Sequence, residues 1–257
     1  KLNNNLCDFL NLDEKFLMKK PGISYLSGNS IPKSSKPISM VYAGHQFGHF
    51  VEQLGDGRAV LLGEIKAKND KLFDIQLKGS GKTIFSRQGD GRSPLDSVIR
   101  EYIISEALYY LGIPTTRSLA IISTGEYVER ESRLPGGILT RVASSHIRIG
   151  TFEFFHYKND LKSLKRLADY SILRHFPDLT DKKNKYQKFF EQIMTLQAEL
   201  ISKWINLGFI HGVMNTDNTA ISGETIDYGP CAFMNKYNPN TVYSYIDVNG
   251  RYAYGNQ

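Results

Sequence analysis

Hydrophobic and polar residues in the first half of the chain alternate with the period of a β-strand. Residues 72–78 follow this alternation, residues 59–65 form a mainly apolar run of strand length, and the turn residues 68–71 separate them, which predicts an antiparallel hairpin. Residues 115–124 and 137–142 are further runs of strand length. We therefore expect an antiparallel sheet in this half, preceded by a glycine-rich segment that begins at Tyr42.

One long helix between these strands has clear start and stop signals. Ser93 is a favourable N-cap residue, Pro94 suits the first helical position, and Gly112 stops the helix. The apolar stripe of this helix is predicted to contain Ile99, Ile103, Ala107 and Leu111, widened by Leu95, Val98 and Tyr102.

Beyond Ser144 the apolar residues recur with the period of helices. Residues 161–176 form one amphipathic segment, and residues 187–207 form a second, stronger one. A shorter helix is expected at residues 10–18. Strands with one long helix, followed mainly by helices, predict an α+β protein in two lobes. We assign residues 1–143 to an N-terminal segment with a small lobe, and residues 144–257 to a large lobe.

The second amphipathic helix leads into a stretch that carries two acidic residues. Asp217 and Asn218 are adjacent, and Asp227 follows a turn at Ser222-Gly223. Two short strands joined by that turn would bring the three side chains together. Such oxygen ligands suit a Mg²⁺ ion that also holds substrate phosphates. A loop and hairpin without a metal explain these residues equally well, because Asn, Asp and Gly are common in turns.

Basic residues and glycines in the first half fit a polyphosphate. Lys78 ends a strand that should be mostly buried, and Glu101 in the long helix is its natural ion-pair partner; kinases position nucleotide phosphates with such a pair. The sequence Gly-Asp-Gly-Arg occurs at residues 55–58 and again at 89–92, the second time just before the N-terminus of the long helix, where unpaired N–H groups favour an anion. Arg141 and Arg148 add planar positive charge. Taken singly, each of these residues is also explained as a turn, surface or structural residue.

Composition and charge narrow the classes of protein only slightly. The apolar fraction of 41% allows a sizeable core, and the chain has no run of about 18 apolar residues that would span a membrane. No signal peptide is evident, and the first residue is Lys rather than Met, so we expect that the natural N-terminus is missing. Cys7 and Cys231 are the only cysteines, which argues against a disulfide scaffold and a cysteine-based zinc site and favours a cytoplasmic location.

The net charge of +6 indicates anionic partners, either nucleotides or nucleic acid. Nucleic acid is not expected, because no aromatic residues are interleaved with the lysines around residues 182–183. His45 and His49 stand four residues apart, a spacing that some metal sites use. The glycines around them and the absence of a zinc-protease Glu favour a structural role.

Seven motifs, in order along the chain, resemble those of the selenoprotein O family. They are Tyr-Ala-Gly-His-Gln-Phe-Gly (42–48), Gln-Leu-Gly-Asp-Gly-Arg-Ala (53–59), Gln-Leu-Lys-Gly-Ser-Gly (76–81), Ser-Arg-Gln-Gly-Asp-Gly-Arg (86–92), Gly-Ile-Pro-Thr-Thr-Arg (112–117), Ser-His-Ile-Arg-Ile-Gly-Thr-Phe-Glu (145–153) and His-Gly-Val-Met-Asn-Thr-Asp-Asn (211–218). The resemblance covers residues 26–257. It implies a protein-kinase-like fold and an adenylyltransferase that moves AMP from ATP to Ser, Thr or Tyr hydroxyls of proteins, with Mg²⁺ or Mn²⁺ and release of pyrophosphate.

The resemblance also implies a role for each matching position. Asp217 is the expected proton acceptor, Asn218 and Asp227 are the expected metal ligands, and Lys78 is expected to bind phosphate while Glu101 holds it. The nucleotide-binding residues that it implies are Gly55, Gly57, Arg58, Lys78, Asp90, Gly91, Glu101, Arg141, Arg148 and Asp227.

Two features depart from ordinary protein kinases. When His211 and Asn218 are aligned with the kinase His-Arg-Asp…Asn pattern, Val213 falls on the catalytic Asp, and a valine cannot accept a proton. The resemblance explains this by ATP bound in reversed orientation, with its γ-phosphate on the basic residues of the small lobe and its α-phosphate at the metal.

The second departure is length. The chain ends 30 residues after Asp227, so we expect an incomplete large lobe. A kinase-type phosphotransferase and a non-catalytic ATP-binding pseudokinase scaffold are the alternative functions. A mitochondrial location is expected if the chain is eukaryotic.

Overall fold

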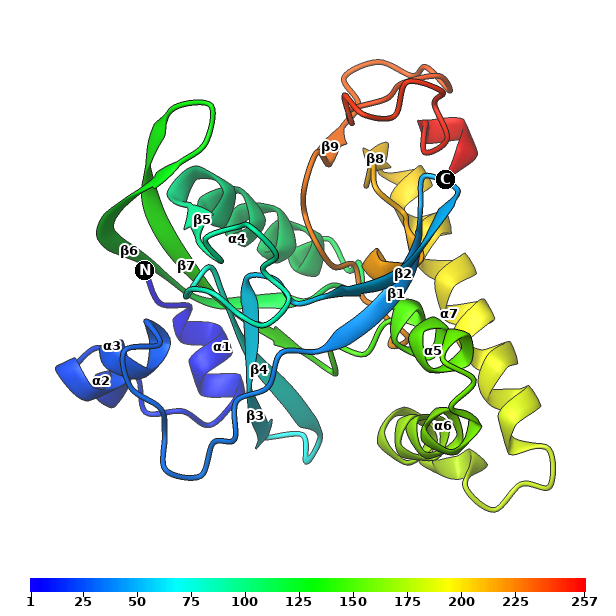
Figure 1. The fold of residues 1–257 in the computed structure, drawn as a ribbon, viewed down its shortest axis with the longest axis horizontal. Helices are drawn as coiled ribbons and strands as arrows, with labels where there is room; N and C mark the ends of the chain where they lie inside the picture. The colour runs from blue at the N-terminus through cyan, green and yellow to red at the C-terminus, as the bar shows by residue number, and fades with distance from the viewer. The chain divides into compact units, whose positions relative to one another are not determined.

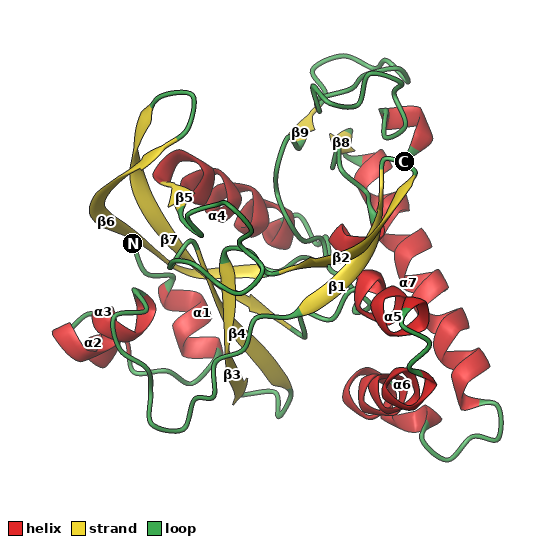
Figure 2. Ribbon diagram, in the orientation of Figure 1, coloured by secondary structure: helices red, strands yellow, loops and turns green.

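The computed structural model describes residues 1–257, which form two compact units. Unit 1 comprises residues 1–41, 55–111 and 115–146, and unit 2 comprises residues 42–54, 112–114 and 147–257. Helices and antiparallel strands occur together (Figure 2), so the predicted α+β class is confirmed.

Unit 1 is built on a five-stranded antiparallel sheet. Its strands are β3 (Ala59–Lys66), β4 (Leu72–Lys78), β5 (Ser93–Pro94), β6 (Arg117–Glu129) and β7 (Arg133–Ala143). Their order is β3-β4-β7-β5, and β6 also pairs with β7. The hairpin predicted from alternation is confirmed as β3–β4, which pairs Ala59 with Lys78.

The long helix α4 (Leu95–Tyr110) packs on β6 and β7 (Figure 1). It begins after Pro94 rather than at Pro94, because Ser93 and Pro94 pair with β7. The predicted apolar stripe is largely wrong: Ile99, Ile103 and Leu111 are exposed, and of its members only Val98 is among the buried residues, which are Val98, Glu101, Ser105, Glu106 and Leu108. Hydrophobicity misidentified the face because three of the five buried side chains are polar and find partners inside unit 1.

The N-terminal residues form three short helices instead of one helix at residues 10–18. They are α1 (Asn4–Phe9), α2 (Glu14–Leu17) and α3 (Lys20–Leu26). Asn3 caps the first helix and Asp13 caps the second, each through a side-chain oxygen that accepts a backbone N–H. Asn11 lies between them with φ +55°. Because the chain turns there and is capped twice, one continuous helix cannot form. Leu6 and Leu10 join the core that β6 and β7 help to build.

Unit 2 begins with a hairpin that periodicity did not identify. Strands β1 (Val41–Gln46) and β2 (His49–Gly55) are joined at Phe47 and Gly48, whose φ angles of +51° and +89° suit a tight two-residue turn.

The predicted helical segments are confirmed as α6 (Leu161–His175) and α7 (Lys185–Asn206). They accompany α5 (Ile149–Tyr157) in unit 2, and a 3-10 helix, η1 (Pro177–Leu179), follows α6 (Figure 1).

The stretch with the acidic residues is closed at its base by two short strands. β8 (Phe209–Ile210) pairs with β9 (Ala232–Phe233), with the 3-10 helix η2 (Thr216–Asn218) between them, and a further 3-10 helix, η3 (Tyr254–Asn256), lies near the end of the chain. The two strands predicted inside residues 211–230 are absent. The backbone there bonds to other segments instead: Ile149 donates to Thr219, and Ile221 donates to Ile147. A turn at Ser222-Gly223 is present, with Gly223 at φ +72°.

The longest helices of the chain are too short or too polar to cross a membrane.

Candidate active site

Asp217 lies in η2, and its carboxyl group is buried. Only one of the two carboxyl oxygens has a hydrogen-bond partner. The residue is 6% exposed. Its Oδ2 accepts a hydrogen bond from Gln46 Nε2 at 3.1 Å, whereas Oδ1 is buried and has no hydrogen-bond partner. Because a buried oxygen without a partner is costly, this atom is available to a proton or to a group that the protein binds.

Glycines let the surrounding backbone approach Asp217 closely. A Cβ atom at Gly44 would lie 2.4 Å from Asp217 Oδ1, and one at Gly150 would lie 2.2 Å from the carbonyl oxygen of Ala43. These glycines and Gln46 were not identified as site residues from the sequence. The available signal was that Gly44 and Gln46 lie within the motif at residues 42–48 and Gly150 within the motif at residues 145–153.

Burial raises the pKa of the Asp217 carboxyl, and the hydrogen bond from Gln46 opposes that shift. A carboxyl group whose pKa lies above its usual value takes up a proton more readily than an exposed one. This property suits a general base that must accept a proton from a hydroxyl group.

Asn218 and Asp227 complete a set of oxygen donors around Asp217. Asn218 Nδ2 donates to the carbonyl oxygen of Val213 at 3.2 Å, so the amide oxygen, which makes no hydrogen bond, is left for another partner. Asp227 adopts φ +63°, a conformation that Asp and Asn tolerate better than most residues. The unpartnered oxygen of Asp217 and these donors fit a hard divalent cation. No three carboxylate, imidazole or thiol groups gather as a metal site anywhere in residues 1–257.

Arg148 ties Asp227 to η2. Its Nη1 donates both to the Asp227 carboxylate and to the main-chain oxygen of Asp217, the latter at 2.6 Å. The guanidinium also lies over the ring of Tyr42, 4.7 Å from its centroid. The predicted contact of Arg148 with a polyphosphate stays a prediction, and its side chain is buried and paired with the Asp227 carboxylate. It therefore holds the acidic residues together.

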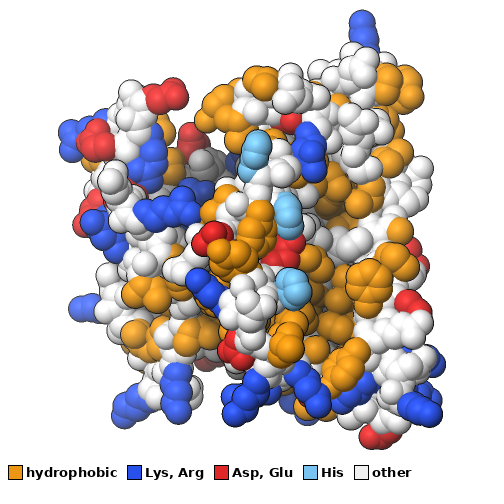
Figure 3. Space-filling model, turned by 45° about the vertical axis from the view of Figure 1, so that its right-hand side comes forward, with side chains coloured by type: hydrophobic (Ala, Val, Ile, Leu, Met, Phe, Trp, Pro, Cys, Tyr) orange, Lys and Arg blue, Asp and Glu red, His pale blue; other side chains and the backbone are white.

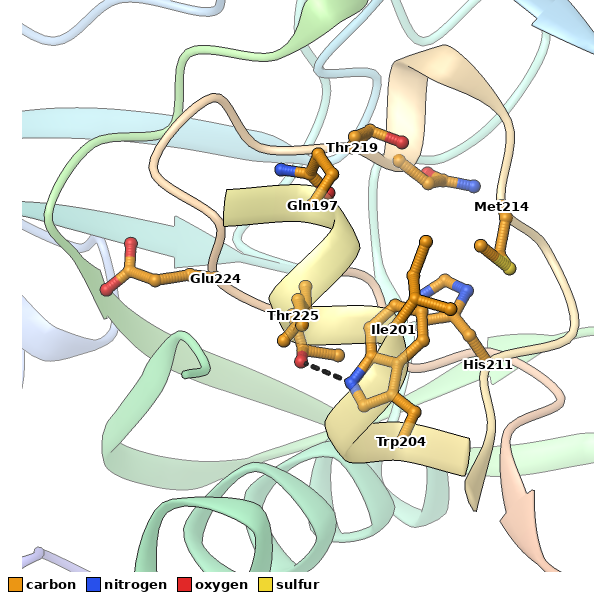
Figure 4. Close-up of a pocket in the computed structure, with 10 residues that line it drawn as sticks. Gln197, Ile201, Trp204, His211, Met214, Thr219, Glu224 and Thr225 are labelled. Atoms are coloured by element: carbon orange, nitrogen blue, oxygen red, sulfur yellow. Dashed lines mark hydrogen bonds between the residues drawn. The ribbon is translucent and has the colours of Figure 1, made fainter. Parts of the chain in front are cut away.

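His211 joins the two ends of the stretch that carries the acidic residues. Its Nε2 lies 2.7 Å from the carbonyl oxygen of Ile226, so this nitrogen carries the proton, and Nδ1 faces the N–H of Val213 at 3.4 Å. Burial lowers the pKa of His211, which keeps the ring neutral. Trp204 stacks on it at 5.4 Å and donates to Thr225 (Figure 4). The two rings line a pocket of about 110 Å³ that also borders Asn218.

A second group of predicted residues meets in unit 1. Glu101 accepts from Lys78 Nζ and from Arg141 Nε, both at 2.5 Å. Arg141 also donates to Gln76 at 3.3 Å, and Gln76 in turn donates to Asp56 at 3.2 Å. Lys78 and Glu101 are the partners that the sequence predicts. Arg141 is fully buried, so Lys78 is the more accessible of the two cations.

The first Gly-Asp-Gly-Arg loop packs against the loop at residues 83–86. A Cβ atom at Gly55 would lie 2.4 Å from the ring of Phe85, and one at Gly57 would lie 2.9 Å from the Phe85 carbonyl oxygen. The protein's own close packing therefore requires both glycines. Arg58 carries an exposed side chain.

The second Gly-Asp-Gly-Arg loop is held by an ion pair. Asp90 accepts two hydrogen bonds from Arg130, at 2.9 and 3.0 Å, and these bonds are the main reason that its pKa falls to about 2. Gly91 has φ +69°, and a Cβ atom there would lie 2.1 Å from the carbonyl oxygen of Gly81. The predicted site residues thus form one cluster in unit 2 (Arg148, Asp217, Asn218 and Asp227) and one in unit 1 (Lys78, Glu101 and Arg141), with the two glycine loops also in unit 1.

Comparison with known proteins identifies relatives along the whole chain. The family model described as "Protein adenylyltransferase SelO" matches residues 1–257. A "Protein nucleotidyltransferase YdiU" of Halalkalibacterium halodurans is 60% identical over all of this chain and 52% of its own length. The protein of the same name in Maridesulfovibrio salexigens is 64% identical over 90% of this chain and 47% of its own length. The chain spans about half the length of the curated relatives that it matches.

Proposed function

The chain belongs to the protein adenylyltransferase SelO family, and we propose that it transfers AMP from ATP to Ser, Thr or Tyr hydroxyl groups of proteins and releases pyrophosphate. The observation that carries this proposal is the carboxyl group of Asp217. It is buried, one of its oxygens has no partner, and it lies beside Asn218 and Asp227. A buried carboxyl group can accept the proton of an attacking hydroxyl group, and a cation held by the neighbouring oxygen donors can neutralise the charge of the phosphate.

We propose that the two units correspond to the lobes of a protein-kinase-like fold. An antiparallel sheet whose strand lysine pairs with a helix glutamate is the arrangement that holds nucleotide phosphates in kinase small lobes. Lys78 on β4 and Glu101 on α4 match it. We propose residues 1–143 for the small lobe and residues 144–257 for the large lobe, although residues 42–54 and 112–114 belong to unit 2 and residues 144–146 to unit 1.

Asn218 and Asp227 are the proposed ligands of a Mg²⁺ or Mn²⁺ ion. Such an ion would neutralise phosphate charge where the acceptor oxygen attacks. Asp227 contributes a carboxylate that Arg148 already orients, and Asn218 contributes an amide oxygen whose own NH₂ group is engaged with Val213. Both ligands are thus held in place by the protein, which lowers the cost of ordering them.

The proposed transfer has a simple balance of bonds. Asp217 takes the proton of the acceptor hydroxyl, whose oxygen forms a bond to the α-phosphorus of ATP. The bond from that phosphorus to the bridging oxygen breaks, and pyrophosphate leaves with its electron pair. We propose that Lys78 and Arg58 bind the γ-phosphate, so that ATP lies in reversed orientation. The remaining nucleotide-binding residues that we propose are Gly55, Gly57, Asp90, Gly91, Glu101, Arg141, Arg148 and Asp227.

The test is the identity of the group that reaches protein. The chain is incubated with Mg²⁺ and ATP labelled at the α- or γ-phosphate, and the intact mass of the acceptor protein is measured. AMP addition with α-label is expected, and Asp217→Asn should abolish it. Label arriving only from the γ-phosphate would show a kinase-type phosphotransferase. ATP binding without any turnover, unchanged by Asp217→Ala, would show a pseudokinase scaffold.

A further inference from the structure

Unit 2 contains a second pocket that the proposed transfer does not use. Its volume is about 420 Å³, and it is lined by residues of the β1–β2 hairpin and of α5 with the residues that follow it: His45, Phe50, Glu153, His156, Tyr157 and Asn159. Histidine, acidic and hydrophobic side chains, with lysine and arginine side chains beside them, lie on the face that Figure 3 shows. This pocket therefore combines aromatic surface with a carboxylate.

The wall of the pocket is a row of three rings. The rings of His45 and Phe50 are 4.9 Å apart, and those of Phe50 and Tyr157 are 5.4 Å apart. Aromatic faces attract cations through the negative potential above the ring. The chain already uses this contact nearby, because Lys158 Nζ lies 5.5 Å from the centroid of the Tyr157 ring.

Glu153 gives the pocket its charge. Its carboxylate accepts from His45 Nδ1 at 2.9 Å and from Thr216 Oγ1 at 2.5 Å, and its side chain remains 21% exposed. No lysine or arginine of the chain pairs with it. A carboxylate offers about four acceptor positions, so the two hydrogen bonds leave capacity for a cation. A partly buried negative charge beside aromatic rings is complementary to a basic side chain and repels an acidic one.

The pocket also lies next to the proposed base. Thr216, which binds Glu153, is the residue before Asp217, and its Oγ1 also accepts the N–H of His45 at 2.9 Å. A group seated at Glu153 therefore lies beside η2, where the acceptor hydroxyl would be activated.

We propose that this pocket binds the side chain of a lysine or arginine residue in the protein acceptor, a few residues from the hydroxyl that is modified. The inference rests on the proposed function for its biological meaning, but the binding itself does not require AMP transfer. It names a property of the acceptor, which is a basic residue at a fixed distance from the modified Ser, Thr or Tyr.

The experiment compares pairs of synthetic peptides. Each peptide has one serine and one lysine, placed at each position from four before to four after the serine, and its partner has norleucine, which has an uncharged side chain of similar length. Affinity for the 257-residue chain is measured by calorimetry without ATP, and AMP incorporation is measured separately. The variants are Glu153→Gln and Phe50→Leu. Glu199→Gln, which removes a charge from an exposed position on α7, is the matched control.

In at least one register the lysine peptide should bind about tenfold more tightly than its norleucine partner, the factor that one charge-assisted hydrogen bond provides. Glu153→Gln and Phe50→Leu should bring this ratio close to one, while Glu199→Gln should preserve it. A merely structural role of Glu153 would weaken both peptides equally and leave the ratio intact, which overturns the proposal. Equal or undetectable binding of both peptides in every register overturns it too. If the unchanged chain binds the lysine peptide more tightly but incorporates no AMP, the proposed transferase function is refuted and the proposed basic-residue pocket is supported.

Discussion

The carboxyl group of Asp217 is surrounded by backbone from several segments of unit 2. Gln46 donates to it from β1, and Gly44 and Gly150 leave no room for a larger side chain beside η2. Burial raises its pKa, so the folded chain binds this proton more tightly than the unfolded chain does. Ionisation of this residue therefore costs stability, and the cost grows as the pH rises above the unfolded value of about 3.9 until the folded-state carboxyl is also ionised.

Asp217→Asn should consequently stabilise the chain while it abolishes AMP transfer. Because the variant carries no buried charge, its free energy of unfolding at pH 7 should exceed that of the natural sequence by about 1 kcal/mol. The difference should shrink as the pH is lowered towards 4, where the wild-type carboxyl becomes protonated in both states. Urea unfolding at several pH values measures it, with the exposed Asp178→Asn as the control. A variant less stable than the wild type at pH 7 would contradict this account.

Gly44→Ala should do the opposite. The added methyl group would lie 2.4 Å from Asp217 Oδ1, so the carboxyl group or the strand must move, at a cost of about 1–3 kcal/mol. Activity should fall with the displaced carboxyl group. Gly229→Ala is a useful comparison because open space surrounds that position, and its thermal unfolding should change little. Equal losses in the two variants would show that the close approach at Gly44 is unimportant.

At the scale of elements, α4 buries a face that is mainly polar. Its buried face contains Glu101 and Glu106, each paired with cations of unit 1, whereas Ile99 and Ile103 point outward. Periodicity correctly located this helix, α6, α7 and the β3–β4 hairpin. It could not choose the face of α4, because the partners of the glutamates lie on strands that no local window contains.

The cost of truncating α4 should follow burial rather than hydrophobic periodicity. Leu108 is 0% exposed and Ile103 is 56% exposed. Leu108→Ala should therefore destabilise the chain by about 2–5 kcal/mol, and Ile103→Ala by about 0.5 kcal/mol or less. Equilibrium unfolding in urea distinguishes them. If Ile103→Ala proves as costly as Leu108→Ala, the orientation of the helix described here is wrong.

At the scale of the whole molecule, the chain order and the units do not coincide. Residues 42–54 belong to unit 2 although unit 1 surrounds them in sequence. The sequence analysis identified Asp217, Asn218 and Asp227 as site residues because they lie close together in the chain. It missed Gln46, which is 171 positions away from Asp217. A contact of that separation leaves no periodic or turn signal, so only the folded chain reveals it.

The proposed function implies that ATP with Mg²⁺ stabilises the folded chain. At about 100 times its dissociation constant, a ligand that binds only the folded state adds about 2.7 kcal/mol. Lys78→Ala in unit 1 and Asp227→Asn in unit 2 should each strongly reduce the rise in melting temperature. Asn is chosen at position 227 because it tolerates the positive φ angle there. A shift that survives in either variant would remove that residue from the nucleotide site.

The stack of Trp204 on His211 gives the chain an optical probe of its own. Trp204 is the only tryptophan, and the imidazole beneath it is hydrogen-bonded to the residue before Asp227. Tryptophan fluorescence therefore originates from a single indole stacked on His211, close to the acidic loop. Any ligand that shifts Asn218 or Asp227 can be followed through the colour and intensity of that emission, without attaching a dye.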